Sequence, residues 1–199
     1  MAARGKARVP SESELKRLFS VAKNGFHGLR NSAVLAVSYR LGLRAKEISA
    51  LRVIDVLDAE GRLRDECCLS AAATKGGRPR IAYLSNSAVR SALKTYLDER
   101  REAQGLQFDL RSPLFMSQKG GGFSPNTMQQ LLHRLHDRAG IIGGRSHSGR
   151  RWMATELISK GIDIKAVSVL LGHSSVAMTS HYADDNPQRL RRIAASVGS

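Results

Sequence analysis

The sequence predicts an α+β fold that is mainly α-helical and carries one small three-stranded antiparallel sheet. Over most of the chain, apolar residues recur at the three- and four-residue spacing of amphipathic helices. Between residues 53 and 84 the pattern changes to short strand-like runs separated by turn signals. With 42% hydrophobic residues in a chain of 199, the sequence also contains enough apolar side chains for a substantial core.

Two helices are expected near the start of the chain. The first begins at Ser11, whose hydroxyl caps it, and Glu14 completes a capping box. The second covers residues 31–39, which are apolar almost all round. This pattern predicts a central buried helix, and Gly42 is placed to end it.

A third, short helix is expected over residues 43–52, with Ile48 and Leu51 facing inward. Arg44 stands at its start and Glu47 follows three residues later. Residues three apart are neighbours on a helix surface, so the guanidinium and the carboxylate are expected side by side.

The sheet is expected to consist of strands at residues 53–57, 67–72 and 78–84. Pro79 belongs at a strand start or on the sheet edge, because proline cannot donate to a ladder. Lys75 then lies at the tip of a hairpin, from which it can reach a bound ligand.

The remaining chain is expected to be helical, and we divide the whole sequence into an arm and one domain. Helices are expected over residues 87–104, 124–139, 147–160 and 163–171, with one more in the tail at 187–197 on Leu190, Ile193 and Ala194. Residues 1–10 are interpreted as a basic arm or linker remnant. Residues 11–199 are interpreted as a single domain.

The charge of the chain indicates a polyanionic partner. The sequence has 32 Lys and Arg against 17 Asp and Glu, a formal net charge of +15. Such an excess predicts binding to nucleic acid, and the low aromatic content of 5% favours duplex phosphates over stacked single-stranded bases. A basic surface that serves only solubility is the competing interpretation.

Several classes of protein are not indicated. The two cysteines, Cys67 and Cys68, are neighbours and give no disulfide framework, which suits a reducing interior. The first ten residues lack the apolar core of a signal peptide, and no segment approaches the ~20 apolar residues of a membrane span. We therefore expect a cytoplasmic protein that does not interact with membranes.

A group of side chains suited to attack on a phosphodiester is spread along the chain. Its members are Arg44, Lys75, His147, Arg150, His173 and Tyr182. Guanidinium groups suit the non-bridging oxygens of a phosphate, on which negative charge develops. Tyrosine is a suitable covalent nucleophile, and a lysine on a hairpin tip can protonate the leaving oxygen.

The other histidine patterns have simpler interpretations. A zinc site at His147, His173 and His181 lacks the Cys or spaced carboxylate that would complete its shell, so no metal is expected. His133 and His136 are interpreted as surface polar residues, and the pair His27 and Arg30 as a solvated turn.

The order of four motifs resembles the catalytic domain of the tyrosine recombinase family, of the phage-integrase type. These motifs are GLRAKEISALR, TKGGRPR, HSGRR and LGHSSVAMTSHYA, and the resemblance runs from about Ser11 to the end. It implies a site-specific recombinase that works through a 3′-phosphotyrosyl link and needs no metal or nucleotide cofactor. By the same resemblance, Arg44 is the first clamp arginine supported by Glu47, Lys75 the general acid, His147 and Arg150 the HxxR pair, His173 the second histidine and Tyr182 the nucleophile.

The resemblance also implies partners and an origin. Double-stranded DNA is the expected substrate, contacted in addition by Arg78, Arg145 and Arg151. The expected assembly is a homo-oligomer, a tetramer in the synapse, with accessory DNA-bending proteins as further candidates. A bacterial, phage or mobile-element origin with association to the nucleoid is implied.

Two departures from the family pattern leave alternatives open. Gly149 stands where the family usually has leucine, and glycine costs a helix ~1 kcal/mol relative to alanine, so a looser helix start is expected. No separate core-binding domain precedes the catalytic motifs, so the chain is either a compact recombinase or a catalytic fragment. A type IB topoisomerase that cuts and reseals one strand, or a DNA-binding regulator with the same fold, are the alternative functions.

Overall fold

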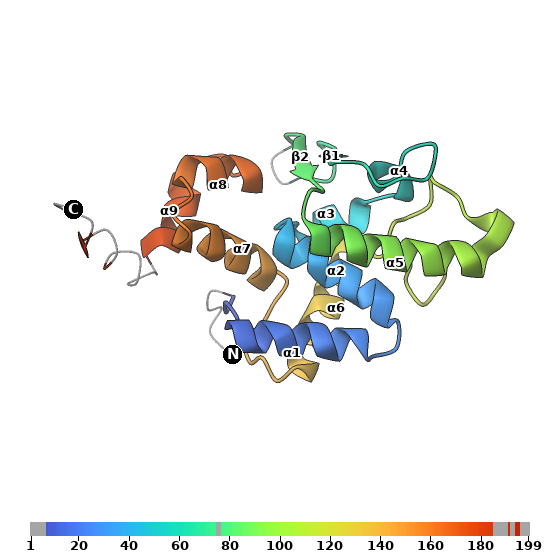
Figure 1. The fold of residues 1–199 in the computed structure, drawn as a ribbon, viewed down its shortest axis with the longest axis horizontal. Coiled ribbons are helices and arrows are strands. Elements are labelled where there is room, and N and C mark those ends of the chain that lie inside the picture. The colour runs from blue at the N-terminus through green and yellow to red at the C-terminus, as the bar shows by residue number, and fades with distance from the viewer. Residues whose placement is uncertain (1–6, 75–76, 185–190, 192–193, 196–199) are drawn as a thin grey trace.

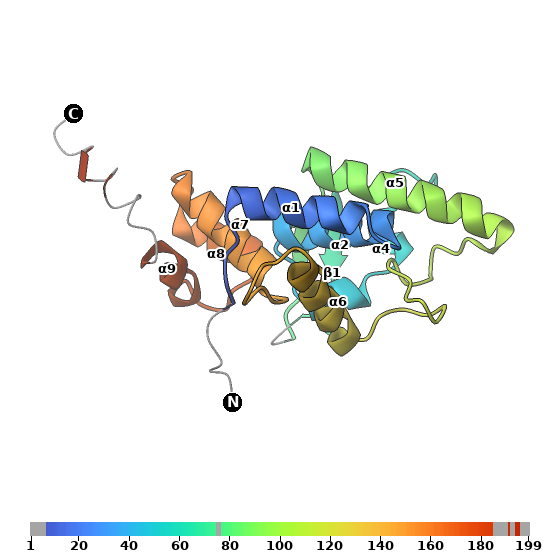
Figure 2. The same cartoon turned by 90° about the horizontal axis from the view of Figure 1, so that it is seen from below.

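Helices form most of this computed structural model, which describes residues 7–74, 77–184, 191 and 194–195. The elements are arranged as an elongated body with the described amino end and the last helices near one end (Figures 1 and 2). In chain order they are α1 (Glu12–Lys23), α2 (Gly28–Arg40), α3 (Ala45–Ala50), α4 (Val53–Val56), β1 (Glu66–Leu69), β2 (Arg80–Tyr83), α5 (Ser87–Gln104), the 3-10 turn η1 (Gly105–Gln107), α6 (Pro125–Arg138), α7 (Ser148–Ser159), α8 (Ile164–Leu171) and α9 (Ala177–Asp184).

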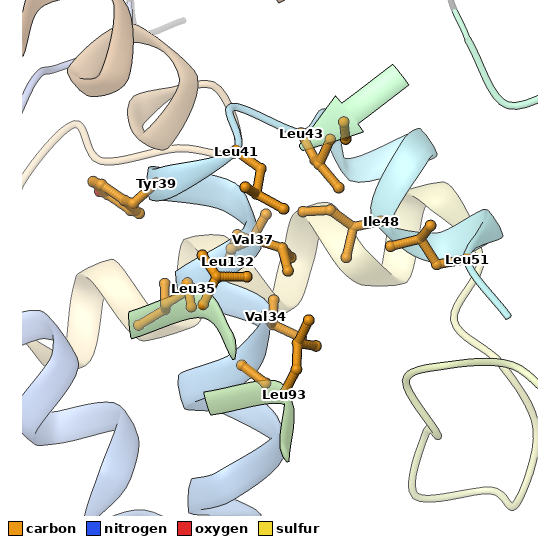
Figure 3. Close-up of a cluster of buried hydrophobic side chains, with 14 of the residues drawn as sticks. Val34, Leu35, Val37, Tyr39, Leu41, Leu43, Ile48, Leu51, Leu93 and Leu132 are labelled. Carbon is orange, nitrogen blue, oxygen red and sulfur yellow. The ribbon is translucent and has the colours of Figure 1, made fainter. Parts of the chain in front are cut away.

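The core is built around α2, as the apolar run at 31–39 predicts. This helix packs against α1, α3, α5 and α7, and its side chains are buried on nearly every face. Figure 3 shows Val34 and Val37 of α2 close to Ile48 of α3, Leu93 of α5 and Leu132 of α6. Burial of one such side chain contributes roughly 1.5–3 kcal/mol to the stability of the folded state. The core therefore holds the elements that carry the site in fixed positions.

Helix boundaries follow the capping signals of the sequence. The backbone N–H of Ser11 donates to Oε2 of Glu14 at 2.9 Å, and the N–H of Glu14 donates to Oγ of Ser11 at 3.3 Å. The expected capping box is therefore confirmed. In the same way, Asp163 accepts from the N–H of Ala166 at 2.9 Å and begins α8.

The three-stranded sheet is corrected to two strands in the described residues. Strands β1 and β2 pair antiparallel, with Glu66 opposite Tyr83. The strand expected at 53–57 is wrong, because Val53–Val56 forms the helical turn α4. The carboxylate of Asp55 accepts the N–H of Arg52 at 2.7 Å, and the N–H of Ile54 donates to the carbonyl of Leu110 at 2.7 Å. These bonds satisfy the backbone that a strand would have paired.

One helix near the carboxyl end was not expected from the sequence. Helix α9 follows α8 closely, where the sequence predicts no helix. Leu190 and Ile193 of the expected tail helix lie outside the described residues. Near the amino end, Arg8 forms an ion pair with Glu14 of α1 at 2.9 Å.

Within the part of the chain that the structure describes, no helix is long and apolar enough to cross a membrane.

Candidate active site

Five of the six expected catalytic residues line one cavity of about 460 Å³. They are Arg44, His147, Arg150, His173 and Tyr182. Helices α7, α8 and α9 pack on one another beside it, at the end of the body that Figure 1 shows on the left. Lys75 lies outside the described residues, directly after Thr74, which lines the same cavity.

A buried carboxylate holds two arginines at one side of the cavity. Glu47 is 0% exposed, and its Oε1 accepts from Nη1 of Arg44 at 3.0 Å. Arg80 of β2 donates to the same carboxylate through Nε at 3.2 Å and Nη2 at 2.8 Å. The expected pairing of Arg44 with Glu47 is observed, and Arg80 is an additional partner that sequence reasoning missed.

The ionisation of Glu47 follows from these contacts. Burial by itself raises the pKa of this carboxyl group, but hydrogen bonds and positive charge from Arg80 and Arg44 outweigh burial. The net pKa lies below the ordinary value, so Glu47 is ionised at neutral pH. The carboxylate therefore offsets part of the positive charge that would otherwise separate Arg44 from Arg80.

Arg80 also connects the sheet to α8. Its Nη1 donates to the carbonyl of Leu170 at 3.1 Å. Gly172, which ends α8 with a left-handed φ of 63°, passes directly over this side chain. A Cβ at residue 172 would lie 2.4 Å from Cδ of Arg80, so glycine is required here by both conformation and space.

Arg150 is fixed in the floor of the cavity. The residue is 3% exposed, and its guanidinium donates to the carbonyls of Gly42, at 2.8 Å, and Leu171. These bonds use two of its five N–H groups. Burial, followed by the positive charges of Arg44 and Arg80, lowers the pKa of Arg150 to about 9, which still leaves it charged at pH 7. We call Arg44, Arg80, Arg150 and Glu47 together the arginine cluster.

Gly149 allows α7 to approach α2 closely. A Cβ at this position would lie 2.5 Å from Oγ and 2.8 Å from the carbonyl oxygen of Ser38 in α2. The expectation of a loosened helix start is therefore wrong, because Gly149 and Ser148 are buried within a formed first turn. The α2–α7 contact leaves no room for a side chain at this position, and the neighbouring Arg150 stands on the same turn of α7.

His173 and Tyr182 lie beside each other at the other side of the cavity. Their rings stack with centroids 6.2 Å apart and an interplanar angle of 27°. Burial first, and then the charges of Arg150, Arg44 and Arg80, lower the pKa of His173 to about 4, so its imidazole is neutral at pH 7. Its Nδ1 lies 2.7 Å from Oγ1 of Thr179, a fully buried residue of α9 that the sequence does not single out.

The three arginines expected to contact DNA differ in their exposure and contacts. Arg78 is exposed just before β2, and Arg145 is exposed just before α7. Arg151 is half-buried, and its guanidinium stands over the Tyr182 ring at 5.5 Å from the centroid. Arg151 therefore also touches the phenol ring by a cation–π contact, a role that sequence reasoning missed.

Two of the simpler histidine interpretations are wrong. His136 is 0% exposed rather than on the surface, with Nε2 2.7 Å from the hydroxyl of Tyr39. Arg30 is buried rather than solvated, and its Nη1 donates to the carbonyl of Met116 at 2.9 Å. Both side chains support the core, and no local sequence pattern distinguishes them from surface residues.

The described residues contain no cluster of three or more His, Cys, Asp or Glu side chains that could hold a metal ion.

Curated relatives with similar sequences are named as tyrosine recombinases. XerC of Pelobacter propionicus is 31% identical over 168 residues, which cover 84% of this chain and 51% of the relative. XerD of Ralstonia nicotianae is 32% identical over 193 residues, covering 94% and 60%. The chain thus spans less than two thirds of the length of these relatives.

The fold and the family model agree with these sequence matches. The crystal structure of XerA recombinase superposes with a TM-score of 0.75 at 28% identity, covering 98% of this chain and 67% of the other. The model described as "Phage integrase family" matches residues 9–189, nearly all of the chain. On this match, the chain belongs to the phage integrase family.

Proposed function

We propose that this chain is the catalytic part of a site-specific DNA recombinase that cleaves and rejoins DNA through a 3′-phosphotyrosyl intermediate. The observation that carries the proposal is the shared cavity, which the guanidinium groups of Arg44 and Arg150 line together with the phenol of Tyr182. Two fixed positive groups beside a potential nucleophile suit a phosphodiester. The names of the similar proteins, XerC and XerD recombinases, support the same reaction.

The proposed reaction assigns a role to each side chain. Arg44 and Arg150 bind the non-bridging oxygens of the scissile phosphate and stabilise the charge that develops on them. The phenolic oxygen of Tyr182 bonds to phosphorus as its proton passes to bulk water, and the bond from phosphorus to O5′ breaks. His147 and His173 complete the cavity wall around the phosphate, and Glu47 holds Arg44 in place.

The leaving O5′ must take up a proton, for which we propose Lys75 as the general acid. Lys75 lies outside the described residues, and its neighbour Thr74 lines the cavity. Rejoining reverses the steps: an O5′ hydroxyl attacks the phosphotyrosyl bond, returns its proton and releases Tyr182. The covalent link conserves the bond energy, so no nucleotide cofactor is required.

The proposed substrate is double-stranded DNA, and the proposed assembly is a homotetramer on two duplexes. The net charge of +15 and the exposed side chains of Arg78 and Arg145 support contact with the phosphate backbone. We propose residues 11–199 as the catalytic domain and residues 1–10 as an arm or linker remnant. We propose nucleoid DNA in the cytoplasm of a bacterium or its mobile elements as the site of action, which the bacterial origin of the similar XerC and XerD recombinases supports.

A nicked suicide duplex tests the nucleophile directly. After cleavage such a duplex loses its short 5′-hydroxyl fragment, so a covalent protein–DNA adduct accumulates. We expect the wild-type chain to form this adduct and Tyr182→Phe to form none, while DNA affinity changes less than about twofold, since only one hydroxyl is removed. Tyr83→Phe is the matched control, because Tyr83 is exposed on β2 and does not line the cavity. Adduct formation by Tyr182→Phe would overturn the proposal.

A second substrate tests the general acid. Lys75→Ala should slow cleavage of a normal duplex by roughly 10²–10⁴-fold, the usual contribution of a general acid. A duplex with sulfur in place of the bridging O5′ has a leaving group that needs no proton, so Lys75→Ala should cleave it nearly as fast as wild type. Equal slowing on both substrates would remove Lys75 from this role.

A further inference from the structure

His173 lies between two parts of the site. Two residues before it, the main-chain carbonyl of Leu171 accepts from the guanidinium of Arg150. Nδ1 of the His173 ring lies 2.7 Å from Oγ1 of Thr179. Thr179 belongs to α9 and precedes Tyr182 by three residues, which places both on neighbouring positions of one helix. The hydrogen bond of the His173 ring therefore reaches the helix that carries the phenol, while the chain just before His173 contacts the arginine cluster.

The direction of this hydrogen bond decides which ring nitrogen carries the proton. A neutral imidazole has one N–H donor and one acceptor nitrogen, whereas a hydroxyl donates once and accepts at two lone pairs. If Nδ1–H donated to Thr179, the threonine proton would need another acceptor. Thr179 is 0% exposed, and the bond to His173 is the one its hydroxyl makes within the described part of the chain. The reverse direction would therefore leave a buried donor unsatisfied, at a cost of about 1–3 kcal/mol.

The surroundings of His173 favour the neutral ring that this argument requires. Arg44, Arg80 and Arg150 all lie close enough to disfavour a second proton on the imidazole, and burial acts in the same direction on its pKa. A doubly protonated ring would force Nδ1 to act as a donor toward Thr179. The neutral ring keeps Nδ1 available as an acceptor and leaves Nε2 for the cavity that His173 lines.

We propose that Thr179 is a positioning residue whose hydroxyl donates to Nδ1 of His173 and thereby holds the imidazole in the Nε2–H tautomer. The cavity then receives an N–H donor from this ring, which suits an anionic oxygen of a phosphate diester. Because the bond originates on α9, the donor is set only when the helix bearing Tyr182 is docked. This role deepens the proposed recombinase function and rests on it.

The tautomer can be measured on the DNA-free protein without any activity assay. Long-range ¹⁵N–¹H NMR of the histidine rings, with the His173 signals assigned from a His173→Asn spectrum, identifies which nitrogen is protonated. We expect Nε2 to carry the proton in the wild type and in Thr179→Ser, which keeps the hydroxyl. Thr179→Val has nearly the same shape without the donor, so the ring is no longer held in one tautomer and the Nδ1–H fraction should rise above that of the wild type. A protonated Nδ1 in the wild type, or identical tautomers in Thr179→Val and wild type, would overturn the proposal.

Cleavage kinetics supply the second measurement. Thr179→Val should lower the rate of adduct formation at saturating suicide duplex about tenfold, as expected for loss of one buried hydrogen bond, with DNA affinity unchanged. Thr179→Ser should recover most of that rate. Thr95→Val, on the exposed side of α5, controls for loss of a helical hydroxyl far from the site. A Thr179→Ser variant as slow as Thr179→Val would contradict a role for the hydroxyl.

The two proposals fail in distinguishable ways. Adduct formation by Tyr182→Phe would reject the recombinase reaction, whatever the tautomer of His173. An unchanged tautomer in Thr179→Val, together with adduct formation that depends on Tyr182, would reject only the role of Thr179. Should Thr179→Val fold poorly, the wild-type spectrum alone still decides the direction of the hydrogen bond.

Discussion

The two sides of the cavity are built in different ways. The arginine cluster is anchored in the core, where Glu47 is 0% exposed and Arg150 donates to main-chain carbonyls of two separate segments. Helix α9, by contrast, is short and largely exposed, and Thr179 is its one fully buried side chain among the described positions. The side that carries the arginine cluster is therefore preorganised by buried ion pairs and hydrogen bonds, whereas the side that carries Tyr182 depends on few contacts.

This difference predicts that substitutions on one side chiefly change stability and substitutions on the other chiefly change reactivity. Buried ion pairs are costly to break because the remaining charge loses its partner. Removal of a single polar atom from an exposed or half-buried side chain changes the free energy of unfolding only slightly. The predictions below test this contrast.

The largest effect is expected for Glu47→Gln. The amide keeps the shape of the side chain but leaves the positive charges of Arg44 and Arg80 uncompensated in a buried setting. The free energy of unfolding, measured by urea denaturation, should fall by about 3–5 kcal/mol. Asp98→Asn breaks the exposed pair with Lys94 and should cost less than about 1 kcal/mol. Equal effects of the two variants would mean that the arginine cluster is not anchored as described.

A smaller loss is expected for Gly149→Ala. The added methyl group would meet Oγ and the carbonyl oxygen of Ser38 at 2.5 and 2.8 Å, so α7 must shift away from α2. Overpacking of this kind costs about 1–3 kcal/mol. Gly121→Ala is the control, because a Cβ there meets nothing within 4 Å. If Gly149→Ala were as stable as its control, the close α2–α7 contact would not constrain Arg150.

Much of the fold could be predicted from local signals. The period of apolar residues and the caps at Ser11 and Asp163 define helices whose bounds agree with the structure within a few residues. The strand prediction for Val53–Val56 is wrong because the β-branched residues suggest a strand. The hydrogen bond from Arg52 to Asp55 and the bonds to the loop at 110–112 favour a helical turn instead. Tertiary partners override propensity there.

The site was less predictable where a residue acts through distant contacts. The motif residues that line the cavity are found from their chemical types and order, whereas Arg80 appears in the sequence only as one more basic residue of a strand. Its bonds to Glu47 and Leu170 depend on how β2 meets α3 and α8. Helix α9 is missed for a related reason, since its apolar period is weak and its docking depends on Thr179.

Acid should weaken the core where His136 of α6 contacts Tyr39 of α2. Burial is the main cause that lowers the pKa of His136 below its ordinary value, and the ring is neutral when it accepts from Tyr39 and donates to the carbonyl of Leu132. In the unfolded chain, His136 binds a second ring proton more readily than in the folded protein. The contribution of the neutral ring to the free energy of unfolding is therefore fully present above about pH 6.5 and is lost as the pH falls below that value. The slope can reach about 1.4 kcal/mol per pH unit for one group.

The measurement is urea denaturation at several pH values between 5 and 8. His136→Asn should be less stable than wild type at pH 8 but should lose less stability on acidification, because the titrating ring is gone. Parallel curves for wild type and His136→Asn would show that His136 does not carry the acid sensitivity. His173, whose pKa is also lowered, contributes in the same direction and remains in both proteins.

The smallest change in stability is expected for Tyr182→Phe, compared with Tyr39→Phe. The Tyr182 hydroxyl makes no hydrogen bond to the described part of the chain, and the phenyl ring keeps its stacking on His173 and its contact with Arg151. Unfolding free energy should therefore change by less than about 0.5 kcal/mol. Tyr39→Phe leaves Nε2 of the buried His136 without its donor and should cost about 1–3 kcal/mol. Both variants lose one phenolic oxygen. A larger loss of unfolding free energy in Tyr182→Phe than in Tyr39→Phe would contradict the contrast between the anchored core and the few contacts of α9.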